Sequence, residues 1–189
     1  MTDNKITIIG GGLAGCEAAW QAAKLGCHVS IIEMKPNKFS PAHKYDGLAE
    51  LVCSNSFRSD DPTSAVGLLK REMRQLDSLI MKAADCHQVP AGKALAVNRD
   101  LFSDYITQHL NDHHLITISN KEIKELPSAE SSQQFHPTIL ATGPLTTEEL
   151  TESLVKLTGK EHLSFYDAIA PIVYEESLDR KIVFQASRY

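Results

Sequence analysis

The stretch from Lys5 to Glu33 decides the fold, and it reads KITIIGGGLAGCEAAWQAAKLGCHVSIIE. The isoleucines at its start predict a short buried strand, and the apolar run 29–33 predicts a second one. Between them, the Ala-rich segment 13–25 predicts a helix that ends at Gly26. Strand, helix and strand in this order are typical of the opening unit of a Rossmann-like α/β domain.

The glycines between the first strand and the helix have the spacing Gly-x-Gly-x-x-Gly. Gly10 permits a tight turn, Gly12 lets a diphosphate approach the backbone, and Gly15 lets the helix pack closely on the strand. The free N–H groups and the positive end of the helix dipole then face the phosphates. The alternative is a glycine-rich turn without a ligand. We expect a dinucleotide to lie over six residues: Gly10, Gly11, Gly12, Leu13, Ala14 and Gly15.

Glu33 ends the second strand about 20 residues after the glycines, where the dinucleotide fingerprint requires an acid. A carboxylate at this position accepts hydrogen bonds from a ribose 2′-hydroxyl and repels a 2′-phosphate. The sequence therefore favours FAD or NAD over NADP as the resident nucleotide.

The composition is that of an ordinary soluble protein, because 42% of the 189 residues are hydrophobic and 23% are charged. The length allows a substantial core and predicts one domain, or one and a part. No apolar run reaches the roughly 18 residues of a membrane span, and the first residues lack the pattern of a secretory signal. We therefore expect a cytoplasmic protein without a membrane partner.

The four cysteines show neither a Cys-x-x-Cys motif nor metal-ligand spacing. This argues against a zinc site and gives no sign of a disulfide framework, so we expect no metal. Cys16 and Cys27 flank packed helix and strand positions and are interpreted as core residues. Cys86, at a helix end, is interpreted as unreactive.

The charges are unevenly distributed, although the net charge is only −5. Residues 35–99 carry 10 basic and 7 acidic groups, whereas residues 100–189 carry 7 and 14. This asymmetry is consistent with one face that meets an anion. Two ordinary solvated surfaces would give the same counts, and charge alone favours that plainer reading.

Segment 35–63 has no regular periodicity and contains three prolines, so we expect a long functional connection. Within it, residues 47–60 read GLAELVCSNSFRSD. A short apolar turn therefore leads into a thiol surrounded by small hydrogen-bonding residues and an arginine, which is not a disordered composition.

Segment 64–84 is predicted to form one amphipathic helix, with Ser64 or Thr63 as its N-cap. Its apolar residues recur at spacings of three and four: Val66, Leu69, Met73, Leu76 and Ile80. Lys70, Arg71 and Arg74 lie mostly off this stripe, so we interpret them as a solvated face rather than a phosphate clamp.

The segments after residue 84 predict further strands and helices. We expect a loop or hairpin over 89–93, a strand over 94–97, and a helix from a cap at Asn98 or Asp100 to about Leu110. Residues 115–119 and 122–126 alternate and predict a β pair, followed by a surface loop over 127–137. A helix over about 147–157 and a folded tail to about Phe184 complete the chain.

Residues 137–144 read PTILATGP, an apolar strand that ends in small residues where a backbone passes close to something. The plainer reading is a strand that ends in a turn. The segment resembles the second glycine signature of FAD proteins of the two-dinucleotide-binding, glutathione-reductase-like class, in which this loop lies against the cofactor. Gly143 therefore joins the predicted site. No second Gly-x-Gly-x-x-Gly occurs, so we expect one tightly held dinucleotide.

Taken together, these motifs resemble the TrmFO family of FAD- and folate-dependent tRNA (uracil-5-)-methyltransferases. The resemblance covers the whole chain and is most specific around Cys53. The segments that carry it, besides the opening unit, read AELVCSNSFRS (49–59), AVGLLK (65–70), VPAG (89–92), ALAV (94–97), ATGPL (141–145), YDA (166–168) and APIV (170–173).

This resemblance implies an enzyme that methylates C5 of the T-loop uridine, position 54, in the T-arm of tRNA. The carbon would come from 5,10-methylenetetrahydrofolate, the electrons from reduced FAD, and NADPH or NADH would be the ultimate reductant. Uracil C5 becomes nucleophilic when a thiolate adds at C6, so such an enzyme needs an activated cysteine. Cys53 is the candidate for a reactive thiol in this half, since Arg58, Ser54 and Ser56 could lower its pKa. Three roles stay open for it, namely attack on the uracil, contact with the flavin and assistance of proton transfer, and the alternative is a buried structural cysteine.

Members of this family are about twice as long as this chain, so the resemblance covers their amino-terminal half. A second cysteine that the family uses would lie beyond Tyr189. We accordingly divide the apparently truncated FAD-binding domain, residues 1–189, into five parts: a dinucleotide unit 1–34, a cysteine loop 35–63, a helix and β insertion 64–137, a second glycine strand 138–144 and a partial remainder 145–189.

Three other functions remain open from the sequence. The related flavoprotein family that modifies the wobble uridine of tRNA shares the glycine opening, but its cysteine loop differs from residues 51–56. The chain could also be a non-catalytic FAD-binding half, or a general flavin oxidoreductase that acts on a small molecule.

Overall fold

The computed structural model describes residues 4–126, 136–159 and 175–183. The strands are β1 (Lys5–Ile9), β2 (His28–Glu33), β3 (Ser56–Ser59), β4 (Gln88–Val89), β5 (Ala94–Val97), β6 (Ile116–Asn120) and β7 (Thr138–Leu140). The α-helices are α1 (Leu13–Lys24), α2 (Ala65–Gln75), α3 (Leu79–Cys86), α4 (Arg99–Asn111) and α5 (Glu148–Thr158), and two short 3₁₀ helices cover Gly143–Leu145 and Glu175–Ser177.

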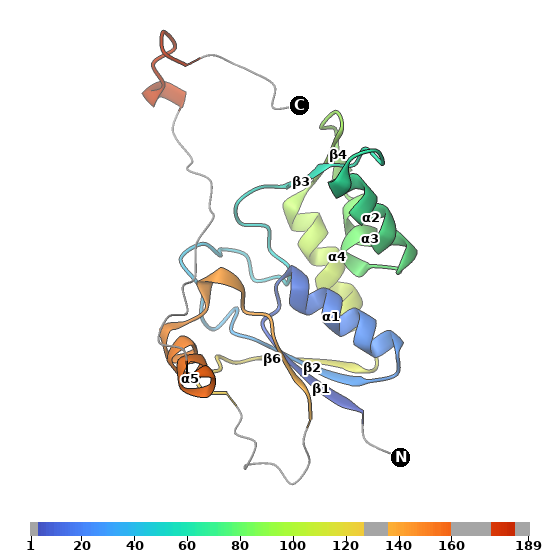
Figure 1. Ribbon diagram of the computed structural model, residues 1–189, viewed down its shortest axis with the longest axis vertical. Helices are drawn as coiled ribbons and strands as arrows, with labels where there is room; N and C mark the ends of the chain where they lie inside the picture. Colours follow the sequence, from blue (N-terminus) through green and yellow to red (C-terminus); the bar gives the residue numbers. More distant parts are fainter. Residues whose placement is uncertain (1–3, 127–135, 160–174, 184–189) are drawn as a thin grey trace.

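Four parallel strands form the larger sheet, in the order β6-β2-β1-β7. This is the order of a Rossmann domain, in which the first strand lies between the second strand and the fourth. Figure 1 shows α1 over one face of this sheet and α5 on the side where the strands end. The predicted Rossmann-like α/β fold is therefore confirmed. The strand order reverses between β1 and β7, and ligands of such sheets bind in the crevice at that point.

The main core lies between this sheet and α1. Ile8 and Ile31 on the sheet, and Cys16 and Ala19 on the helix, have no exposed surface. The small helix residues let α1 approach the strands closely, and burial of each isoleucine side chain contributes about 1.5–3 kcal/mol. The interpretation of Cys16 as a core residue is confirmed, and Cys27 packs partly buried against the same core.

Residues 56–111 form a second packing unit beside α1 (Figure 1). Here β3, β5 and β4 make a three-stranded antiparallel sheet, which confirms the predicted strand 94–97 and the predicted hairpin before it. Helix α4 starts at the predicted cap, where the Asn98 side chain accepts a hydrogen bond from the backbone N–H of Leu101. Phe102 of α4 is fully buried, and its ring centre lies 5.5 Å from that of Phe57 on β3.

The single helix predicted over 64–84 is wrong, because the chain breaks after α2 and restarts at α3. Asp77 adopts a left-handed φ of 61°, and the Ser78 hydroxyl then caps α3 by accepting from the N–H of Met81. The Trp20 ring N–H holds the bend by donating to the Asp77 carbonyl at 3.1 Å. The predicted N-cap is correct, since the Ser64 side chain accepts from the N–H of Gly67.

The β pair predicted over 115–119 and 122–126 is also wrong. The first segment is a strand, β6, but it pairs in parallel with β2 instead of with the residues that follow it. Residues 122–126 are not a strand. They continue past the end of β2, where the N–H of Lys121 donates to the Glu33 carbonyl at 2.8 Å, and reach α5, where the N–H of Leu126 donates to Ser153 Oγ at 3.0 Å.

The predictions for the carboxyl-terminal part are tested only in part. The strand before Gly143 and the helix predicted over about 147–157 are present as β7 and α5. Most of the predicted loop 127–137, the motifs at 166–168 and 170–173, and most of the predicted tail lie outside the described residues. Among the helices of the described ranges, none is long and apolar enough to cross a membrane. The division of the chain into five parts stays a prediction.

Candidate functional site

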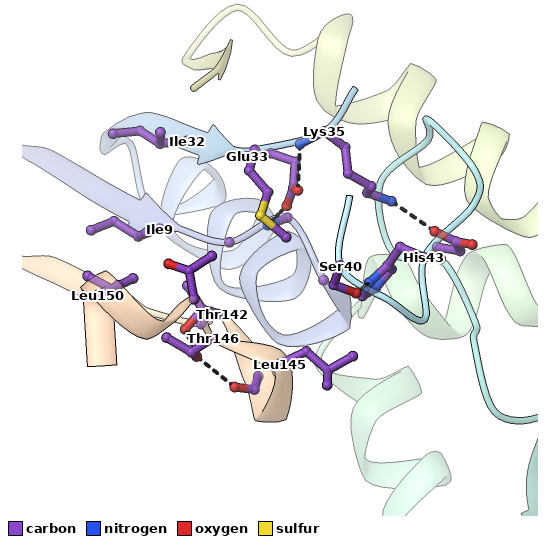
Figure 2. A pocket seen from close by; sticks show the side chains of 18 of the residues that line it. Ile9, Ile32, Glu33, Lys35, Ser40, His43, Thr142, Leu145, Thr146 and Leu150 are labelled. Atoms are coloured by element: carbon purple, nitrogen blue, oxygen red, sulfur yellow. Dashed lines mark hydrogen bonds and ion pairs between the residues drawn. The ribbon is translucent and has the colours of Figure 1, made fainter. Parts of the chain in front are cut away.

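A cavity of about 340 Å³ opens at the carboxyl ends of β1, β2 and β7. It is lined by Ile9, Gly10, Gly11, Gly12, Leu13, Ala14, Ile32, Glu33, Met34, Lys35, Ser40, His43, Glu50, Val52, Cys53, Lys121, Glu122, Ile123, Ala141, Thr142, Gly143, Pro144, Leu145, Thr146, Thr147 and Leu150. Figure 2 shows Ile9, Ile32 and Leu150 at one end of this cavity, and Lys35, Ser40 and His43 at the other, with Leu145 below them. The cavity lies at the switch point of the sheet, where the fold favours a ligand.

The glycine loop lines the cavity, and the three glycines of its motif, Gly10, Gly12 and Gly15, have different surroundings. A Cβ on Gly10 would lie 2.5 Å from the carbonyl oxygen of Ala141, so the two glycine signatures pass in backbone contact. A Cβ on Gly15 would lie 2.0 Å from the Gly10 carbonyl oxygen. By contrast, a Cβ on Gly12 would meet nothing within 4 Å. The loop is thus closed on its own chain and open toward the cavity at Gly12.

Two polar features of the cavity wall lack a partner within the protein. Helix α1 starts after Gly12 with no side-chain cap and no acidic residue in its first turn, so the N–H groups of that turn are not capped by a side chain. The nearby Glu33 carboxylate binds the N–H of Gly11, which precedes the helix. Across the described residues, Thr147 Oγ1 is the one buried side-chain oxygen or nitrogen without a hydrogen-bond partner. A buried hydroxyl without a partner is costly. Both features fit a polar, anionic ligand.

Glu33 is buried at 8% exposure and is held in place by the backbone around it. One carboxylate oxygen accepts from the N–H of Gly11 at 2.6 Å, and the other accepts from the N–H of Lys35 at 3.0 Å. A carboxylate has about four lone-pair sites, so each oxygen keeps capacity for a further donor. Glu33 therefore remains able to accept hydrogen bonds from ribose hydroxyls.

The loop after β2 is anchored by an ion pair that the sequence did not reveal. The Lys35 side chain is buried, and its ammonium donates to the carbonyls of Tyr45 and Gly47 at 2.9 and 2.6 Å and to Glu50 at 3.2 Å. Glu50 also accepts from the backbone N–H groups of Lys44 and Tyr45 at 2.9 and 3.1 Å. A buried ammonium and carboxylate with several partners each fix the path of this loop.

Ser40 and His43 lie on the same loop and face the cavity. Ser40 is 8% exposed, and its hydroxyl lies 2.6 Å from His43 Nδ1. Partial burial lowers the pKa of His43 from its ordinary value, and the positive charge of Lys35 lowers it further, against a smaller opposite effect of the Glu50 and Glu33 carboxylates. His43 is therefore neutral at pH 7.

Cys53 lines the same cavity as the glycine loop and is exposed. Its segment is attached on both sides: the N–H of Ala49 donates to the Gly11 carbonyl at 2.8 Å, and Asn55 exchanges two hydrogen bonds of 2.9 and 3.0 Å with Val97. Ala49 and Arg58 both have a left-handed φ, of 52° and 64°. Such backbone conformations are uncommon for residues with side chains and cluster at functional sites.

The two serines expected to activate Cys53 are engaged elsewhere. Ser54 Oγ accepts from the N–H of Ser56 at 3.0 Å, and Ser56 Oγ accepts from the N–H of Arg58 at 3.1 Å. Their hydroxyl oxygens thus shape the turn that leads from the thiol into β3. The role of Cys53 as a reactive thiol stays a prediction.

Lys70 and Arg74 do not form the solvated face predicted for them. Lys70 is 6% exposed, and its ammonium donates to the carbonyls of Ser59 and Val66 at 2.7 and 3.2 Å. Arg74 donates two hydrogen bonds of 3.0 Å to the Asp60 carboxylate and two more, of 2.8 and 2.7 Å, to Asp85. These two residues attach the end of β3 to α2. Arg71 is exposed, as expected.

The structure therefore brings most of the predicted site residues to one cavity. Gly10 to Ala14, Glu33, Cys53 and Gly143 line it, whereas Gly15 lies behind the loop and serves its packing. The sequence analysis missed Lys35, Ser40, His43 and Glu50, although the irregular, proline-containing segment that carries them was a signal. Within the described ranges, no group of three or more His, Cys, Asp or Glu residues could hold a metal ion.

Comparison with known proteins gives one family-level match. The model of the family described as glucose inhibited division protein A, GidA, matches residues 5–189. Among solved structures, Aquifex aeolicus GidA superposes with a TM-score of 0.53 at 17% sequence identity and covers 68% of this chain and 21% of that chain. At this identity, the likeness shows the fold alone.

Curated relatives carry a more specific name. A methylenetetrahydrofolate–tRNA-(uracil-5-)-methyltransferase TrmFO of Desulfotalea psychrophila is 60% identical over 186 residues, which are 98% of this chain and 41% of the relative. The TrmFO of Desulforamulus reducens is 55% identical over 189 residues, or 100% of this chain and 42% of the relative. The chain thus spans about two fifths of the length of these relatives.

Proposed function

The chain belongs to the GidA family, and from that membership we propose that it forms the FAD-binding part of a folate-dependent tRNA (uracil-5-)-methyltransferase. The resemblance to TrmFO proteins drawn from the sequence motifs is confirmed by relatives that are 53–60% identical over nearly all of this chain. The observation that carries the proposal is a single cavity lined both by the glycine loop and by Cys53.

FAD is the cofactor that these residues fit best. The open space at Gly12 and the uncapped first turn of α1 suit a diphosphate, and the anchored Glu33 carboxylate suits the ribose of the adenosine half. The Thr147 hydroxyl, which is buried without a partner, gives the cavity a further polar contact for the ligand. Gly143 follows β7, the strand that pairs with β1, and lines the same cavity.

When bound, the flavin would supply hydride and carbon transfer from the folate donor. The chain's own residues bind it, orient it and restrict water around it. NADPH or NADH is the proposed reductant, and 5,10-methylenetetrahydrofolate the proposed carbon donor. The substrate is the uridine at position 54 in the T-arm of tRNA, which would place the reaction in the cytoplasm.

Cys53 is the proposed nucleophile. Addition of its thiolate sulfur to C6 of the uracil ring moves the electron pair of the C5–C6 double bond toward C5, and C5 can then attack the donor carbon. The exposure of Cys53 at the cavity supports this assignment, because a tRNA base has to reach the sulfur. Cys16 is unsuited, since burial raises the pKa of its thiol to about 12.

A second candidate function is supported by the cavity alone, because the glycine loop and Glu33 suit FAD whether or not a reaction takes place there. In this reading, the 189 residues bind FAD without turnover. The same cavity serves both readings, so a binding measurement alone does not separate them.

The proposal is tested by purifying the 189-residue chain, recording its flavin spectrum, and assaying tRNA with ¹⁴C-labelled methylenetetrahydrofolate and NADPH. We expect bound FAD and label at uridine 54. The Cys53→Ser variant should keep FAD and lose the label, whereas Cys86→Ser, which removes another exposed thiol, should keep both.

Three outcomes separate the readings. FAD without label would support the non-catalytic half. Label that survives Cys53→Ser would exclude Cys53 as the nucleophile. A chain that binds no flavin after correct folding would overturn the cavity assignment itself.

A further inference from the structure

Ser40 and His43 form a polar pair in the cavity and have no role in the function proposed so far. The Ser40 hydroxyl and His43 Nδ1 are 2.6 Å apart, and both residues line the cavity. We infer that this pair holds the half of the bound dinucleotide beyond the diphosphate, the half that carries the reactive ring. The inference rests on the proposed FAD site and adds a contact to it.

The position of the pair in the cavity is the first argument. Figure 2 shows Ile32 and Leu150 at one end and Ser40 and His43 at the opposite end. The apolar end suits a flat base, and Glu33 suits the ribose attached to it. With its base at the apolar end and its diphosphate in the open space at Gly12, a dinucleotide would continue toward Ser40 and His43.

The pair is also held rigidly. The ammonium of Lys35 fixes the loop through the carbonyls of Tyr45 and Gly47, and Glu50 binds the N–H groups of the two residues that follow His43. On the other side, the N–H of Ala42 donates to Ser40 Oγ at 3.3 Å. A side chain that is fixed before the ligand arrives binds it with a smaller loss of conformational entropy.

Because its imidazole is neutral, His43 has one ring N–H, which can donate a hydrogen bond to a ligand. The imidazole is neutral at pH 7, because burial and the charge of Lys35 outweigh the Glu50 and Glu33 carboxylates, as described above. In the arrangement that we infer, the Ser40 oxygen accepts from the N–H of Ala42, and the Ser40 hydroxyl donates its own proton to His43 Nδ1. The ring then carries its proton on Nε2. This N–H donates to an acceptor oxygen or nitrogen on the second half of the dinucleotide.

The test compares two ligands on the chain freed of flavin. FAD contains the second half of the dinucleotide, and ADP lacks it. By isothermal titration calorimetry, His43→Ala should weaken FAD binding by about tenfold and leave ADP binding within about twofold, as expected for one lost hydrogen bond. Glu33→Ala should weaken both ligands. His28→Ala, at the exposed start of β2, should weaken neither.

Two amide variants identify the nitrogen involved. The side-chain amide of His43→Gln lies near the position of Nε2, whereas that of His43→Asn lies near Nδ1, so Gln should retain more of the FAD affinity than Asn. Ser40→Ala should weaken FAD by releasing the ring. Circular dichroism and the melting temperature confirm that each variant is folded before its affinity is compared.

The outcomes distinguish this inference from the proposed function. If the wild-type chain binds FAD and His43→Ala binds it equally well, the inference is overturned while the FAD site stands. Equal losses for FAD and ADP would place His43 at the adenosine half and also overturn it. A wild-type chain that does not bind FAD would overturn both.

Discussion

Glu33 and Gly11, 22 residues apart in the chain, are joined by a hydrogen bond of 2.6 Å from the backbone N–H to the carboxylate. The bond connects the end of the second strand to the turn after the first one. It is charge-assisted and buried, and hydrogen bonds of this kind are about twice as strong as neutral ones. The carboxylate thus has a fixed position before any ligand arrives.

We predict that Glu33→Ala lowers FAD affinity by about 1.5–3 kcal/mol, because a charged hydrogen-bond partner of the ribose is lost. Glu33→Gln should lose less, since its amide oxygen can still accept from Gly11. Calorimetric titration of the flavin-free chain measures both values. Flavin content that is unchanged in Glu33→Ala would exclude Glu33 from the adenosine end of the site.

Two glycine substitutions should separate ligand binding from folding. Gly12→Ala has space for its Cβ and an ordinary φ of −74°, so it should cost at most about 1 kcal/mol of unfolding free energy while its methyl group obstructs the diphosphate. Gly15→Ala places a Cβ 2.0 Å from the Gly10 carbonyl and should destabilise the fold itself. Urea unfolding and FAD titration of both variants check this. Similar unfolding midpoints for the two would contradict it.

The buried Cys16 thiol should make the free energy of unfolding decrease at alkaline pH. Burial, reinforced by the Glu33 charge, raises the pKa of its thiol to about 12 from an ordinary value of 9.0. In the unfolded chain the thiol ionises above pH 9, whereas in the folded chain it stays protonated. The contribution of Cys16 to the free energy of unfolding is therefore fully present below pH 9. Above pH 9 it decreases, by up to about 1.4 kcal/mol per pH unit. Urea unfolding between pH 8 and 11 measures the slope, which Cys16→Ala should reduce.

Lys70→Met should loosen the attachment of β3. It removes the donors to the Ser59 and Val66 carbonyls, and loss of these bonds costs about 1–3 kcal/mol. Hydrogen exchange at the Asp60 amide, which donates to the Lys93 carbonyl, should become faster. Arg71→Met, on the exposed neighbour, is the matched control and should change neither quantity. Equal effects of the two variants would contradict a specific role for Lys70.

The sequence predicted the structure correctly where neighbouring residues alone determine it. Residues 5–33 contain their own strand, turn, helix and cap, and Asn98 caps its helix through a side chain three positions away from its partner. The glycine spacing and Glu33 belong to one contiguous unit. For these parts, no distant contact was needed to predict the structure.

The sequence did not predict the structure correctly where contacts between distant residues determine it. Asp77 bends the chain because Trp20, 57 residues earlier, binds its carbonyl, so the unbroken apolar period across 64–84 was misleading. The Asp-Ser pair at 77–78 before two apolar residues was an overlooked N-cap signal. Likewise, β6 pairs with β2 across more than 80 residues, and Lys35 finds its buried partners only when the loop has folded.

The attachment of the cysteine segment at Ala49 and at Asn55 limits how far the sulfur of Cys53 can travel. Only five residues lie between these two attachment points, so the thiol can move only a short distance while both sets of hydrogen bonds remain formed. A larger movement of the thiol would have to separate β3 from β5. If the chain acts on RNA as proposed, the base would therefore have to move to the sulfur, and the bending and unstacking needed for that encounter would fall on the nucleic acid.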